Sequence, residues 1–168
     1  MSSTSVPSVA PIAFQAGEGD VRWFLGALGT IKASADTTAG RLAVLEFRWP
    51  TDTGSPLHVH RNEDEWFYVI DGELTLWVGG EVIVAPAGSF VYGPRDIPHT
   101  FLVTSAPEAR FLMVTEPGQF ADFVRAMSEP ARTHTFPPAS VQAPTPEHLT
   151  ATAAEYGIEI LGPPGIPA

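Results

Sequence analysis

Residues 21–116 consist of short runs in which apolar and polar residues alternate, and this pattern limits the fold more than any other feature of the chain. In the run RLAVLEFRW, Leu45, Phe47 and Trp49 share one face, because side chains alternate along a strand, and the charged residues between them share the other. Glycines and loops such as TDTGSP separate the runs, and no helical periodicity interrupts them. The pattern predicts an all-β domain, built as an antiparallel β-barrel with a buried and a wet side.

The chain on either side of this region has a different character. Residues 1–19 are rich in Ser, Pro and Ala and predict an N-terminal arm, so the barrel is expected over 20–116. Residues 117–168 predict C-terminal helices and a Pro-rich tail that pack on the barrel or on a partner subunit.

Two helices are expected in this C-terminal part. Apolar residues recur at i, i+3, i+4 and i+7 within GQFADFVRAM, namely Phe120, Phe123, Val124 and Met127. This helix, around 118–127, either packs on the sheet or covers the barrel mouth as a lid. A second helix is expected over 146–156, with Thr145 as N-cap, Pro146 at its first position and Gly157 at its end. The tail IEILGPPGIP either pairs as an edge strand or crosses to a partner.

The bulk properties exclude several classes of protein. A length of 168 residues fits one domain, and a net charge of -10 argues against a surface for nucleic-acid phosphates. No apolar run approaches the ~20 residues of a membrane span. The first residues lack the basic start and apolar core of a signal peptide, so we expect a cytoplasmic protein.

The stretch PLHVHRNEDEWFYVIDG carries the candidate chemistry. His58 and His60 lie on one face of a strand, and Glu65 follows five residues later. The runs WFYVI and ELTLWV flank an Asp-Gly turn signal at Gly72 and predict a β-hairpin. His99 begins a later apolar run. Three imidazoles and one carboxylate suit a divalent first-row transition metal, with Fe, Mn, Co, Ni and Zn all open.

The same alternation predicts the wall beside this site. Phe67 and Val69 share the face of Glu65, whereas Phe101 and Val103 share the face of His99. Together with Phe47 they would form an apolar substrate pocket for a flat or hydrophobic molecule. Ordinary core packing is the alternative for each of them.

Two other carboxylates could compete for the ligand role. Glu63 shares the face of Glu65, although the H-x-H-x4-E spacing favours Glu65, and Asp64 points the other way. A solvated loop is the simpler interpretation of Glu63 and Asp64. His134 and His148 lie outside any motif and are expected on the surface.

The motifs also resemble those of a known superfamily. H-x-H-x4-E-x6-G, ending at Gly72, and G-x5-P-x4-H, from Gly88 to His99, are similar to the two cupin motifs. Asp96 and Val103 stand where the second motif usually has Gly and Asn, and Gly54 sits closer than usual to the first His, which affects loop shape rather than ligands. The resemblance implies a jelly-roll-like barrel with one metal held by His58, His60, Glu65 and His99.

A narrower likeness concerns small single-domain quercetin 2,3-dioxygenase-like cupins, carried by EDEWFYVIDGELTLWVGG, GSFVYGPRDIPHTF and AAEYGIEILGPP. It implies a metal-dependent dioxygenase that acts with O2 on a flavonol-like or related aromatic enol substrate, with Glu65 as catalytic proton acceptor. It also implies a homodimer. A metal-dependent polyketide cyclase or isomerase and a non-catalytic small-molecule-binding cupin are the alternatives.

Overall fold

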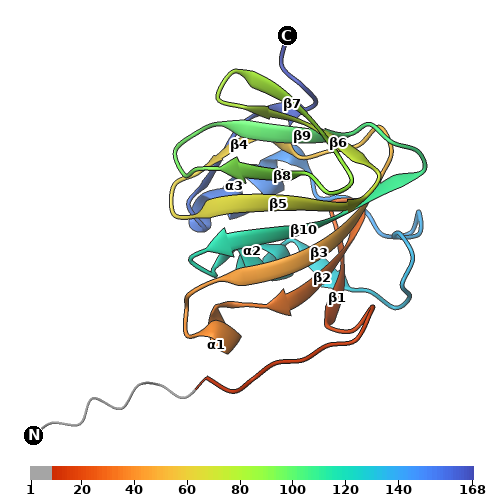
Figure 1. The fold of residues 1–168 in the computed structure, drawn as a ribbon, viewed down its shortest axis with the longest axis vertical. Helices are drawn as coiled ribbons and strands as arrows, with labels where there is room; N and C mark the ends of the chain where they lie inside the picture. Colours follow the sequence, from red (N-terminus) through yellow and green to blue (C-terminus); the bar gives the residue numbers. More distant parts are fainter. Residues whose placement is uncertain (1–8) are drawn as a thin grey trace, which may run out of the picture.

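The structure, a computed structural model, describes residues 9–168, and almost all of their ordered elements are strands (Figure 1). The arm expected over 1–19 lies partly outside the described residues. Its described part, 9–19, precedes the first strand, and residues 9–18 are exposed. The all-β prediction is confirmed.

Two antiparallel sheets make up the molecule. The first contains, in spatial order, β11 (Ser128–Pro130), β1 (Asp20–Phe24), β2 (Ala27–Ala33), β3 (Ala43–Pro50), β10 (Glu108–Glu116), β5 (Asp64–Asp71) and β8 (Phe90–Gly93). The second contains β12 (Ile158–Pro164), β4 (Pro56–His60), β9 (His99–Val103), β6 (Glu73–Val78) and β7 (Glu81–Pro86). This arrangement is consistent with a jelly roll.

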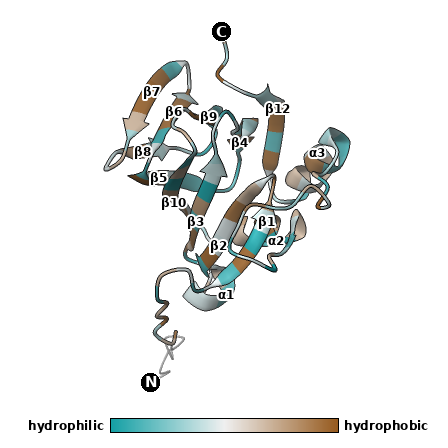
Figure 2. Ribbon diagram, turned by 90° about the vertical axis from the view of Figure 1, so that its right-hand side faces the viewer, coloured by the Kyte–Doolittle hydropathy of each residue, from teal (hydrophilic) through white to brown (hydrophobic). Residues whose placement is uncertain are grey.

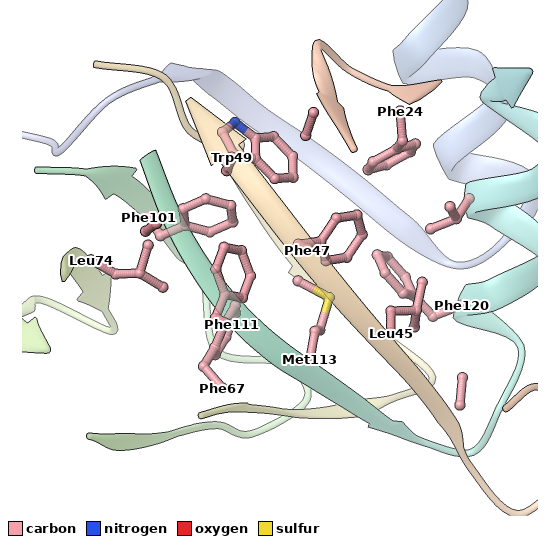
Figure 3. Close-up of a cluster of buried hydrophobic side chains, with 14 of the residues drawn as sticks. Phe24, Leu45, Phe47, Trp49, Phe67, Leu74, Phe101, Phe111, Met113 and Phe120 are labelled. Atoms are coloured by element: carbon pink, nitrogen blue, oxygen red, sulfur yellow. The ribbon is translucent and has the colours of Figure 1, made fainter. Parts of the chain in front are cut away.

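The core lies between the inner faces of the sheets. Alternate residues of β3 are buried, including Leu45, Phe47 and Trp49, as the sequence pattern predicts. Figure 3 shows these side chains in one cluster with Phe101 of β9 and Phe120 from the helical side. Burial of large aromatic and aliphatic side chains is the main force that holds the sheets together.

The hairpin predicted around Gly72 is wrong. The strand before it, β5, pairs with β10 and β8, whereas the strand after it, β6, pairs with β7 and β9. Gly72 therefore lies where the chain crosses between sheets. Its φ is +76°, and a Cβ there would meet the Ser105 Oγ and lie 2.6 Å from the Glu108 carbonyl oxygen. Glycine is needed here for a close crossing rather than for a hairpin turn.

The helices are few. A single turn, α1 (Ala35–Thr38), interrupts the strands, contrary to the expectation of none before residue 116. The expected helix around 118–127 is α2 (Phe120–Ala126), which buries Phe120, Phe123 and Val124. The second expected helix is α3 (Pro146–Glu155), where the Thr145 side chain accepts a hydrogen bond from the His148 amide. Figure 2 shows α2 and α3 on the same side of the molecule.

The C-terminal segment also adds a strand to each sheet. β11 pairs with β1, and β12 pairs with β4. Of the two alternatives for the tail, the structure shows pairing as an edge strand of this chain. The ladder of β12 is interrupted after Ile160 and again after Gly162.

Candidate metal centre

The four candidate ligands come from three strands and both sheets. His58 and His60 lie on β4, and His99 begins β9 directly opposite His58. Glu65 lies on β5, in the other sheet. Because inward positions alternate along each strand, the two sheets direct all four side chains into the space between them.

The ligand atoms lie close together and away from water. One ligand atom of each side chain lies within 4.8 Å of those of the others. The Nε2 atoms of His58 and His60 are 3.2 Å apart, and a Glu65 carboxylate oxygen lies 2.8 Å from the His99 Nε2 atom. His60, Glu65 and His99 are each 1% exposed.

Each imidazole is oriented by a hydrogen bond at Nδ1, the ring nitrogen that faces away from the centre. The Nδ1 atom of His58 lies 2.7 Å from the Pro56 carbonyl oxygen, and that of His99 lies 3.0 Å from the Ile97 carbonyl oxygen. These acceptors favour a proton on Nδ1, which leaves the Nε2 lone pair free to point at the centre. Ligating histidines are commonly fixed by such contacts.

At neutral pH two of the four groups, His58 and Glu65, are in the charge state that a bound cation needs. Burial, reinforced by His99 and His60, lowers the pKa of His58 to about 3, so this imidazole is neutral. Burial alone would raise the pKa of Glu65, but the neighbouring His60 and the hydrogen bond with His99 hold it at about 2. The same carboxylate raises the pKa of His99 against the effect of its burial.

These residues fit a divalent metal. Several lone pairs and one carboxylate face each other in a dry space, where they repel unless a cation or proton lies between them. The Oε1 atom of Glu65 is buried without a hydrogen-bond partner, as expected of an oxygen available to a ligand. Nitrogen and oxygen donors of this kind are typical of first-row transition-metal sites.

For Glu63 the solvated-loop interpretation is wrong, and the residue is not among the four side chains whose ligand atoms converge. It is fully buried rather than solvated, and its carboxylate lies 3.3 Å from the Nδ1 atom of His60. Its shared face with Glu65 was the available signal. Asp64 instead forms an ion pair with Arg95 at 2.8 Å on the half-exposed side of β5, and this pairing lowers its pKa to about 2.

A small cavity of about 40 Å³ adjoins the candidate ligands His58 and Glu65. Phe67 and Phe101 line it, with their ring centroids 6.0 Å apart. Phe47, Val69 and Val103 are fully buried in the core and are not among the residues that line this cavity. Phe120 of α2 also lines it and packs against the His60 ring.

The remaining histidines do not join the site. His134 and His148 are both exposed, as expected.

Among the described residues, no helix has the length and apolar character needed to cross a membrane.

The sequence of this chain matches a protein family and a curated relative. The model of the cupin domain family matches residues 45–115. Over 135 residues, 80% of this chain, the sequence is 30% identical to a quercetin 2,3-dioxygenase of Bacillus subtilis (strain 168). The chain spans about two fifths of that protein's length, since the match covers 40% of it.

Solved structures show the same fold. An RmlC-like cupin from Shewanella frigidimarina matches with a TM-score of 0.57 at 18% identity, over 67% of this chain and 95% of that one. A predicted oxalate decarboxylase from Thermotoga maritima matches with a TM-score of 0.58 at 18% identity, over 63% of this chain and 99% of that one. At this identity the likeness concerns the fold alone.

Proposed function

The chain belongs to the cupin superfamily, and from that premise we propose that it is a metal-dependent dioxygenase acting on a flavonol-like or related aromatic enol substrate. The observation that carries the proposal is the convergence of His58, His60, Glu65 and His99 in a dry space beside two phenylalanine rings. The similarity to a quercetin 2,3-dioxygenase supports the proposed substrate class.

The three histidines and Glu65 would hold one divalent transition metal through Nε2 and carboxylate oxygen atoms. Such a metal supplies Lewis acidity, which lowers the pKa of a coordinated hydroxyl, and a redox-active one also supports chemistry with dioxygen. The buried imidazoles would keep it in place, because their rings are fixed through Nδ1.

Glu65 is the candidate general base. Its carboxylate is ionised at neutral pH and has one oxygen without a hydrogen-bond partner. It can accept the proton of the substrate hydroxyl at that oxygen. Phe67 and Phe101 offer ring faces and edges for a flat substrate and exclude water from the reacting atoms.

The test uses protein purified without a chelating tag, with its metal content measured. Quercetin is added in an oxygen electrode cell, and carbon monoxide release is followed in parallel. We expect stoichiometric oxygen uptake and carbon monoxide release that scale with bound metal. Absence of both with fully metallated protein would exclude the dioxygenase. Turnover of a polyketide-like substrate without oxygen would support the cyclase or isomerase instead.

A further inference from the structure

The cavity beside the candidate ligands is too small for the proposed substrate. Its volume is about 40 Å³, room for a water molecule or two. Pockets that enclose organic ligands are usually about 300–1,000 Å³. To enter this cavity, a substrate with several aromatic rings therefore has to displace side chains of the cavity wall.

A larger groove lies directly outside that wall. It has a volume of about 430 Å³ and is bordered by the β1–β2 turn, the connector before α3, α3 itself and β12. Three half-buried aliphatic residues line both the groove and the inner cavity: Leu25, Leu149 and Ile160. Pro56 is also shared. The groove and the cavity are thus separated by single side chains.

The elements that carry these side chains are weakly anchored. In α3 only Ala153 is fully buried, so the helix is held by little core packing. β12 is an edge strand whose ladder is interrupted just after Ile160. Leu25 has a φ of +50° in a two-residue turn, an uncommon conformation for a leucine, and this places its side chain at the junction.

The lining of the groove indicates what it holds. No charged side chain is among its lining residues, although the protein carries a net charge of -10. Five prolines provide rigid, flat, apolar surfaces: Pro56, Pro144, Pro146, Pro163 and Pro164. Such a surface favours an uncharged, flat aromatic molecule over an anion or a flexible chain.

We infer that this groove is the entrance and holding site for a flat, uncharged aromatic substrate, with Leu25, Leu149 and Ile160 as the inner barrier to the metal cavity. The inference rests on the proposed function for the identity of the reacting molecule. It assigns the C-terminal segment, which lies outside the matched family region, to substrate selection.

The absence of cysteine allows a reversible test. Thr150 is exposed and lines the groove, whereas its neighbour Ala151 is exposed and does not. Thr150→Cys and Ala151→Cys are each labelled with a bulky aromatic methanethiosulfonate, which a phosphine reductant later removes. Binding of flavone, which lacks the hydroxyl needed for reaction, is measured by equilibrium dialysis with metallated protein. Steady-state kinetics with quercetin follow on the same samples.

We expect the label on Thr150→Cys to raise the Kd of flavone and lower kcat/KM for quercetin by about tenfold or more, with both restored on its removal. The label on Ala151→Cys should change either value by no more than about twofold. Unchanged flavone binding in labelled Thr150→Cys, or an equal loss in both variants, would overturn the inference. If quercetin is never consumed but flavone binding follows this pattern, the groove stands and the proposed dioxygenase falls.

Discussion

Glu63 and Glu65 are two buried carboxylates on one face of the chain, but they contact different nitrogen atoms of the histidines. Glu65 reaches the Nε2 side of the histidines, where a metal would bind, whereas Glu63 reaches only the Nδ1 side of His60. A carboxylate behind a ligating imidazole fixes its orientation and increases its basicity. We therefore propose that Glu63 positions His60 and that Glu65 is the carboxylate that meets the substrate.

Glu63→Ala is expected to weaken metal binding by about 10–100-fold, because His60 loses the acceptor for its Nδ1 proton. Glu63→Gln keeps an acceptor oxygen and should recover most of the affinity. Competition with a chromophoric chelator measures both. Equal affinity in wild type and Glu63→Ala would show that the carboxylate does not support His60.

Glu65→Gln separates metal binding from catalysis. It keeps one oxygen donor and the side-chain size but removes the charge and most of the basicity, while the three histidines remain. We expect much of the metal to stay and turnover per bound metal to fall by roughly 10²-fold or more, the scale of losing a general base. Metal content and oxygen uptake are measured on the same sample. Full activity per metal would leave Glu65 as a ligand at most.

At the scale of elements, the crossing at Gly72 is the most demanding local feature. Any side chain there would take a left-handed conformation and collide with the backbone at the start of β10. Gly72→Ala is therefore expected to destabilise the fold by about 1–3 kcal/mol, the usual range for strain with crowding. Urea unfolding measures this. Gly80→Ala is the matched control, since Gly80 also has a positive φ but a Cβ added there would have no atom within 4 Å. Equal losses in the two variants would leave backbone strain alone as the cause.

The strands were predictable because burial leaves a period of two in the sequence, as in β3 and β5. Their partners were not, since Asp71-Gly72 has the same local signal whether the chain turns back or crosses to the second sheet. Alternation along the strand predicted that His58 and His60 share a face, and the resemblance to the cupin motifs implied that Glu65 and His99 converge with them, as they do. The shared face with Glu65 was a signal for the burial of Glu63, whereas the groove beside α3 depends on contacts between distant segments, which no local pattern records.

At the scale of the whole molecule, the candidate metal centre joins the two sheets. The histidines belong to the sheet of β4 and β9, and Glu65 belongs to the sheet of β5. Apart from bonds between these side chains and a metal, mainly apolar contacts in the core hold the described sheets face to face. A metal bound by all four side chains binds only the folded arrangement, so its binding free energy adds to the stability of the entire domain.

Removal of the metal should therefore lower the melting temperature of the whole domain. A metal present at about 1,000 times its Kd stabilises by about 4 kcal/mol, and each kcal/mol shifts Tm by about 2–4 °C in a chain of this size, so we expect a loss of roughly 8–16 °C. Calorimetry with and without a chelator measures the shift in a single transition. His99→Ala is the control: it should bind metal poorly, melt near the metal-free wild type and show no further effect of the chelator. A chelator shift of equal size in His99→Ala would mean that the stabilising metal lies elsewhere, and no shift in metallated wild type would mean that the centre does not tie the sheets together.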